Sequence, residues 1–133
     1  MMSAAAMGAT AFQKGLGAIH ALSHPIGAIY HTHHGTTNAV CMPAVLQFNK
    51  PACADVLGHA ANYLDIDGGF DGFCQFVDDL NQSLGIPKSL TALGITDPDV
   101  DRIVAGALID PSRGGNPVEM TAENTRKLLL DII

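Results

Sequence analysis

The chain has 133 residues, enough for one compact domain with a hydrophobic core of its own. Its formal charge of -6 gives no basic surface of the kind that nucleic acids require, so we expect no nucleic-acid partner. Apolar residues make up 47% of the chain and charged residues only 15%, which predicts an apolar face that a partner covers and favours a homo-oligomer.

The cysteines and the first residues bear on the cellular location. Cys41, Cys53 and Cys74 are odd in number and widely spaced, which is typical of reduced, mostly buried residues in a cytoplasmic protein. The apolar start at 1–6 has no positive residues ahead of it, and Lys14 interrupts any membrane-spanning run. We therefore expect a cytoplasmic protein without a membrane anchor.

Helical signals follow one another from the start of the chain. The Ala-rich residues 3–22 predict a long buried helix whose glycines allow close helix contact. Pro25 and Gly27 then interrupt regular helix. The next helix is expected from Gly35 to about Phe48, with a kink at Pro43.

A third helix is expected to begin near Pro51, with Asn49 as a candidate cap. Residues 70–84 form an amphipathic pattern that Gly85 ends. The apolar face of this helix is predicted to carry Phe73, Phe76, Val77 and Leu80.

The remaining elements are a short helical turn at 88–93 and two further helices. Asp97 is the predicted cap of the first of these, with Pro98 at its first position. Residues 110–117 are expected to form a loop, and Thr121 is the predicted cap of the last helix. No strand pattern of useful length occurs, so the expected fold class is all-α. The apolar stripe of the last helix comprises Leu128, Leu129 and Ile132.

Three histidines carry the chemistry of the sequence. His20 and His24 are four residues apart and project from one face of a helix, and His34 follows beyond an interruption. Such an arrangement can converge on one ion, because neutral imidazole binds Fe²⁺ and Zn²⁺. Six histidines in a chain of this size also cluster by chance, so spacing alone leaves a metal site and a structural pair equally open.

Other candidate sites have less support. The chain contains neither H-E-x-x-H nor C-x-x-C, which gives no basis for a zinc protease or a zinc ribbon. Residues 65–76 have phenylalanine where a calcium loop needs glycine and glutamate. Asn116-Pro117 is interpreted as a turn, and His59 as a packing or surface residue. His31 and His33 are expected to be exposed, although either is an alternative ligand beside His34.

The histidines belong to a longer string. Residues 15–30 read Gly-Leu-Gly-Ala-Ile-His-Ala-Leu-Ser-His-Pro-Ile-Gly-Ala-Ile-Tyr, 33–40 read His-His-Gly-Thr-Thr-Asn-Ala-Val, and 42–49 read Met-Pro-Ala-Val-Leu-Gln-Phe-Asn. This string closely resembles the signature of the iron-containing (group III, metal-dependent) alcohol dehydrogenases, a G-x-x-H-x-x-x-H-x-x-G segment with a later H-G. The tail is similar as well, with Asp110, Gly114-Gly115-Asn116-Pro117 and a helix start at Met120-Thr121.

The resemblance implies a role for each of these histidines. His20 and His34 would be metal ligands, and His24 would line the active site, where it positions the substrate or relays its proton. The fold implied is the helical C-terminal metal-binding domain of the dehydroquinate synthase-like architecture, as one domain over 1–133. In this family Fe²⁺, or sometimes Zn²⁺, lowers the hydroxyl pKa of an alcohol, and hydride passes to the nicotinamide of NAD(P).

Parts of the family pattern are missing from these residues. Family members also carry an N-terminal nucleotide-binding domain with a glycine-rich pyrophosphate turn, and an aspartate and another histidine that complete the ligand set. We therefore expect that the N-terminal domain is absent, that Fe²⁺ or Zn²⁺ is weakly held, and that NAD(P) does not bind this chain. The expected partner is a nucleotide-binding half on another chain.

Two hypotheses about function follow. The first is the C-terminal, metal-binding part of an oxidoreductase that is inactive as an isolated chain. The second is a non-catalytic remnant or interaction module that retains the helical fold and its histidines.

Overall fold

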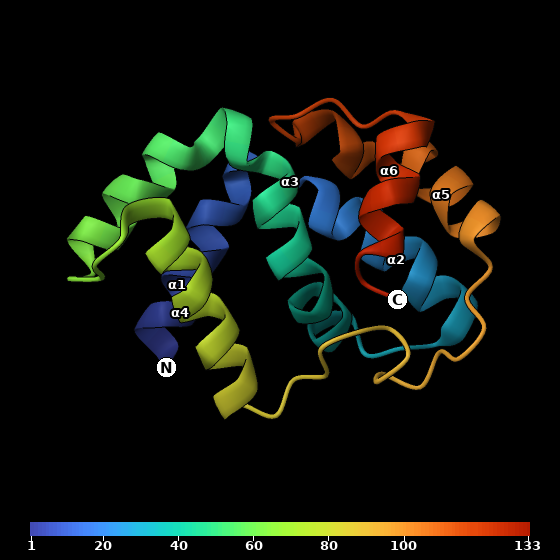
Figure 1. Ribbon diagram of the computed structural model, residues 1–133, viewed down its shortest axis with the longest axis horizontal. Coiled ribbons are helices and arrows are strands. Elements are labelled where there is room, and N and C mark those ends of the chain that lie inside the picture. Colours follow the sequence, from blue (N-terminus) through green and yellow to red (C-terminus); the bar gives the residue numbers. More distant parts are fainter.

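The computed structural model describes residues 1–133, and it consists of helices and turns without a strand (Figure 1). This arrangement confirms the predicted all-α fold. In chain order the elements are α1 (Met2–Ala11), the 3₁₀ turn η1 (Phe12–Lys14), α2 (Ala18–Tyr30), α3 (His34–Tyr63), α4 (Gly69–Ser83), α5 (Val100–Ile109), the 3₁₀ turn η2 (Pro111–Gly115) and α6 (Ala122–Leu130).

The hydrophobic core lies between α2, the first half of α3, α5 and α6. Sixteen buried residues form one cluster there, and Leu22, Ile26, Ile103 and Leu129 within it are fully buried. The turn at 88–94 contributes Leu90, whose backbone N–H donates to the Ile132 carbonyl at 2.7 Å. We call residues 18–50 and 90–132 the bundle. Residues 1–14 and 51–84, which comprise α1, the second half of α3 and α4, are the arm (Figure 1).

The prediction of one long buried helix over 3–22 is wrong. α1 ends at Ala11 and all of its residues are exposed, so its alanines form a helix by propensity without packing into the core. A turn then separates α1 from α2, with Gly15 at φ 98°. Gly17 is needed for a close approach, because a Cβ there would lie 2.9 Å from Oδ1 of Asn116.

The predicted interruption at Pro25 and Gly27 is also wrong, because α2 continues through both residues to Tyr30. The ring of Pro25 packs against Gly106 of α5, where a Cβ would come within 2.6 Å of the Pro25 Cβ. Packing between α2 and α5 therefore holds the proline in the helix. The helix ends at His31, which has the left-handed φ of 55°.

Two predicted helices in the middle of the chain are a single helix, α3. Pro43 and Pro51 both lie inside it, and Asn49 is a buried helical residue rather than a cap. Pro43 has no N–H for the carbonyl of Ala39, and the side-chain amide of Asn81 in α4 donates to that carbonyl at 3.1 Å. Figure 1 shows that α3 is strongly bent.

The helix predicted over 70–84 is confirmed as α4, and the chain after it turns at Gly85 with φ 69°. Its predicted apolar face is only partly right. Phe70, Cys74 and Val77 are buried against α3, whereas Phe76 is 42% exposed and Leu80 is 45% exposed. α4 presents more apolar surface than α3 covers.

The last two helices differ in how well their caps were predicted. Asp97 does not cap α5; Asp99 does, by accepting a hydrogen bond from the Arg102 N–H at 3.1 Å. The backbone N–H of Asp99 donates to the hydroxyl of Tyr30 at 2.7 Å, which fixes Asp99 outside the helix. Thr121 caps α6 as predicted, in a reciprocal capping box with Asn124. The stripe of Leu128, Leu129 and Ile132 is buried.

The cysteines form no disulfide bond. All three cysteines are free thiols; Cys41 and Cys74 are buried and Cys53 is half-buried, as the sequence predicted. Burial raises the pKa of the Cys41 thiol to about 12. None of the helices combines the length and the apolar character that crossing a membrane requires.

Candidate functional site

The start of α2 is fixed by a residue 98 positions further along the chain. Gly17, the N-cap residue of α2, has no side chain, and Oδ1 of Asn116 accepts a hydrogen bond from the Ala18 N–H at 3.0 Å in its place. Asn116 also exchanges two hydrogen bonds with the side chain of Asn49, at 2.9 and 2.7 Å. This amide pair joins α2, α3 and the segment after η2, and so positions the helix that carries His20 and His24.

His34 is the first residue of α3, and the residue before it caps the N-terminus of that helix. The Nδ1 atom of His33 accepts a hydrogen bond from the Thr36 N–H at 3.3 Å, so His33 is the N-cap. His31 is exposed at the end of α2, and His59 is exposed in the arm. The alternative ligands beside His34 are thus one helix cap and one turn residue.

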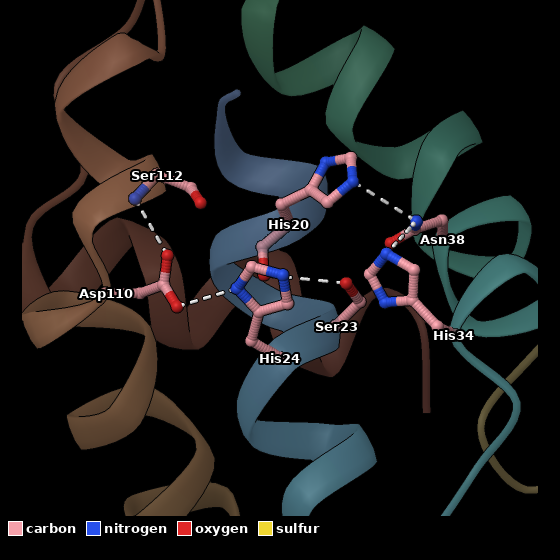
Figure 2. Close-up of polar contacts among 7 residues, drawn as sticks. All are labelled: His20, Ser23, His24, His34, Asn38, Asp110 and Ser112. Atoms are coloured by element: carbon pink, nitrogen blue, oxygen red, sulfur yellow. Dashed lines mark hydrogen bonds and ion pairs between the residues drawn. The ribbon is translucent and has the colours of Figure 1, made fainter. Parts of the chain in front are cut away.

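The structure brings the three predicted site histidines together (Figure 2). The ring centroids of His20 and His34 are 5.2 Å apart, those of His24 and His34 are 5.5 Å apart, and those of His20 and His24 are 5.6 Å apart. Phe12 of η1 lies edge-on to the His20 ring at 6.5 Å. Helix spacing accounts for His20 and His24, and the packing of α2 on α3 adds His34.

Asn38 connects the two histidines that were predicted as ligands. Its side-chain nitrogen lies 3.4 Å from Nε2 of His20 and 3.1 Å from Nε2 of His34 (Figure 2). An amide nitrogen only donates, so both Nε2 atoms accept and their lone pairs face the same small volume. The other side-chain atom of Asn38, Oδ1, is buried without a hydrogen-bond partner.

The charge state of His20 suits a ligand. Burial lowers the pKa of the His20 imidazole, and the neighbouring His34 and His24 lower it further. A neutral imidazole is the form that binds a metal ion. With the lone pairs of both Nε2 atoms directed at one place, His20 and His34 fit two nitrogen ligands of a divalent ion.

His24 has a different partner from the other two histidines. Its Nδ1 lies 2.8 Å from Oδ2 of Asp110, which follows α5 directly. The second oxygen of Asp110 accepts a hydrogen bond from the Ser112 N–H at 2.8 Å. Partial burial raises the pKa of Asp110, but the hydrogen bonds from His24 and Ser112 outweigh it, so the pKa of the carboxyl is below its ordinary value.

The donor set is incomplete for a metal site built by these residues alone. Nowhere in the chain are three or more His, Cys, Asp or Glu side chains arranged to hold a metal ion. The three imidazoles pack edge-on and stacked, and only His20 and His34 direct nitrogens at a common point. The geometry therefore offers two imidazole ligands beside a third, carboxylate-bound imidazole.

Asn38, Asn116 and Asp110 were not predicted as site residues. Asp110 entered the sequence analysis only through the resemblance of the tail, and Asn116 was interpreted as a turn. Asn38 follows His34 by four residues, but its second partner His20 and the partners His24 of Asp110 and Ala18 of Asn116 are 18 to 98 residues away, a distance over which spacing carries no signal. The Gly-Gly-Asn-Pro string was the one local feature that marked this region.

The whole chain, residues 1–133, matches the Fe-containing alcohol dehydrogenase family, C-terminal. The chain belongs to this family. It is 42% identical to the 4-hydroxybutyrate dehydrogenase of Cupriavidus necator, over 97% of this chain and 36% of that protein. It is 32% identical to the lactaldehyde reductase of Escherichia coli K12, over 86% of this chain and 32% of that protein.

The fold is similar to that of solved alcohol dehydrogenase structures. A crystal structure of 1,3-propanediol oxidoreductase superposes with a TM-score of 0.82 and 26% sequence identity, covering 89% of this chain and 33% of that one. The chain thus spans about a third of the length of the relatives it matches. The helical C-terminal domain of the iron-type alcohol dehydrogenases accounts for this share.

Proposed function

We propose that this chain is the metal-binding part of an NAD(P)-dependent alcohol dehydrogenase, and that His20 and His34 supply two of the metal ligands. The observation that carries the proposal is the pair of Nε2 atoms that face one point beside Asn38. Fe²⁺ and Zn²⁺ are the ions of choice, because imidazole suits both and the family is described as Fe-containing.

A divalent ion at this point supplies Lewis-acid chemistry, which favours the ionised form of a bound alcohol. The chain's own residues have three tasks. His20 and His34 hold the ion through their Nε2 lone pairs, and in the metal-free chain Asn38 donates to those same lone pairs and keeps both Nε2 atoms unprotonated until it is replaced by the ion. His24 lies against both rings and serves as the group that accepts the proton of an alcohol hydroxyl.

The nicotinamide and the remaining ligands come from a nucleotide-binding half. Relatives with the names NAD-dependent methanol dehydrogenase, from Bacillus methanolicus, and NADPH-dependent butanol dehydrogenase, from Clostridium saccharobutylicum, support a nicotinamide cofactor. The apolar side chains exposed on α1 and α4 support a protein partner. The isolated chain then produces no NADH from alcohols.

Metal titration of the isolated chain tests the proposal. We expect weak, histidine-dependent binding of Fe²⁺ or Zn²⁺, because two neutral ligands lack the carboxylate and the third ligand of a catalytic site. His20→Ala and His34→Ala each abolish it, and His59→Ala, on an exposed helical position, serves as the matched control. Isothermal titration calorimetry measures the affinity, under anaerobic conditions for Fe²⁺ and in air for Zn²⁺.

Two results would contradict the proposal. One is binding that survives the loss of both His20 and His34. The other is a chain in which His59→Ala lowers the affinity as much as His34→Ala does.

A further inference from the structure

Asp110 is held in place by packing on both sides of it. Before it, Gly106 of α5 packs directly against Pro25, the residue that follows His24. Asp110 comes four residues, about one helical turn, after Gly106, so the end of α5 lies over His24. After it, Asn116 bonds to the start of α2 through the Ala18 N–H. The carboxylate is consequently only 11% exposed, although it follows the end of a helix.

The two oxygens of Asp110 have separate partners. Oδ1 accepts from the Ser112 N–H and caps η2, while Oδ2 lies 2.8 Å from Nδ1 of His24 (Figure 2). An ionised carboxylate only accepts, so Nδ1 of His24 is the donor and carries a proton. The ring of His24 has one hydrogen bond, from Nδ1 to Asp110, and its Nε2 atom is free to accept another.

We propose that Asp110 is a positioning residue, which holds His24 in the Nδ1–H tautomer and thereby keeps Nε2 as a hydrogen-bond acceptor at the His20–His34 pair. This inference rests on the proposed function for its purpose: an acceptor nitrogen at that place takes the hydrogen bond of an alcohol O–H. A carboxylate behind an imidazole commonly fixes its tautomer and its orientation in this way.

His33 provides an opposite case within the same chain. Its Nδ1 accepts the Thr36 N–H at 3.3 Å and also lies 3.1 Å from the Thr36 hydroxyl oxygen. Because a backbone N–H only donates, Nδ1 is the acceptor and the proton of the neutral ring is on Nε2. His24 and His33 therefore have opposite tautomers, because the partner of His24 only accepts and the backbone partner of His33 only donates. His33 serves as an internal reference, because both of its partners belong to Thr36, which a substitution at Asp110 does not alter.

Asp110→Asn separates the positioning role from the capping role. The amide oxygen of Asn still accepts the Ser112 N–H, and the amide NH₂ then faces His24. The reverse orientation would direct the NH₂ at the Ser112 N–H and leave two donors facing each other. His24 must therefore accept at Nδ1 and move its proton to Nε2.

The measurement is long-range ¹H–¹⁵N NMR of metal-free chain labelled with ¹⁵N-histidine, at a pH about two units above the ordinary imidazole pKa. In the wild type we expect Nδ1–H for His24 and Nε2–H for His33. In Asp110→Asn the protonated and unprotonated nitrogen resonances of His24 exchange places, and those of His33 stay. Asp99→Asn, the same change at the aspartate that caps α5, leaves His24 as it was.

Three results would overturn the proposal: Nε2–H for His24 in the wild type, an unchanged His24 in Asp110→Asn, or the same exchange in Asp99→Asn. If Asp110→Asn does not fold, as shown by circular dichroism, the wild-type tautomer decides alone. Because the experiment uses neither metal nor alcohol, its outcome is separate from that of the metal titration.

Discussion

The bundle and the arm are built from similar helices but are stabilised very differently. All sixteen residues of the main hydrophobic cluster belong to the bundle. Of the twelve large hydrophobic side chains that are exposed, ten belong to the arm and only Ile109 and Leu130 to the bundle. The arm therefore has apolar residues at helical spacing without enough surface to bury them against.

The candidate site lies in the bundle for a physical reason. Holding imidazoles at fixed distances requires elements whose own positions are determined by packing. α2 meets α3 and α5 there, and the pair of Asn49 and Asn116 joins α2, α3 and the segment after η2 by hydrogen bonds. From the arm, Phe12 lies edge-on to the ring of His20.

The difference in packing between the bundle and the arm is tested most directly by truncating a leucine in each region. Leu22→Ala, at a fully buried bundle position, should lower the free energy of unfolding by about 2–5 kcal/mol. Leu80→Ala, at an arm position that is 45% exposed, should change it by less than about 0.5 kcal/mol. Urea unfolding followed by circular dichroism measures both, and equal losses would show that the arm is as well packed as the bundle.

The comparison also shows which parts of the fold the sequence predicted. The cap at Thr121 was predicted correctly, since its signal is local. The cap of α5 was predicted two residues too early, at Asp97, because the contact of the Asp99 N–H with Tyr30 of α2 is not visible in the sequence. Rules for proline failed at Pro25, where Gly106 of α5 packs against the ring, and at Pro51, which lies inside α3 and not at the start of a helix. Whether a proline ends a helix depends on what packs against it, and a single sequence does not contain that information.

The same distinction applies to the site. His20 and His24 were placed on one face by helix spacing, His34 was expected to converge with them from the next helix start, and the resemblance implied a role for each. Asp110 acts on His24, 86 positions away, and Asn38 joins its helix neighbour His34 to His20, 18 positions away, so their roles depend on contacts that spacing does not indicate. The histidines were therefore predictable, and the groups that set their tautomers were not.

A second test addresses how the bundle positions the site. Asn116→Ala removes the acceptor of the Ala18 N–H and leaves the buried amide of Asn49 unpaired, so we expect a loss of about 1–3 kcal/mol in unfolding free energy. Asn62→Ala, at an exposed arm position, is the control. In the double variant with Asn49→Ala the loss should be smaller than the sum of the single losses, because the two side chains are partners. Additive losses would mean that the amide pair does not act as a unit.

The smallest expected effect is a pH dependence that originates in the bundle. The pKa of His20 in the fold is lowered, chiefly by burial, from an ordinary value of 6.5. As the pH falls through about 6.5 the unfolded chain takes up a proton at His20 before the folded chain does. The contribution of His20 to the free energy of unfolding is therefore fully present above about pH 6.5 and is progressively lost below it, until the pH reaches the lowered pKa of the folded state. The carboxyl of Asp110, whose pKa is lowered from 3.8, acts only in a more acidic window.

Thermal unfolding of the metal-free chain between about pH 8 and pH 5 measures this dependence. His20→Gln keeps a group that can accept from Asn38 but does not titrate, so the decline in stability with falling pH should be shallower than in the wild type. His59→Gln, at an exposed arm position, should retain the wild-type decline. If His59→Gln flattens the decline and His20→Gln does not, the pH dependence originates in the arm, and the environment of His20 in the bundle is not the one described.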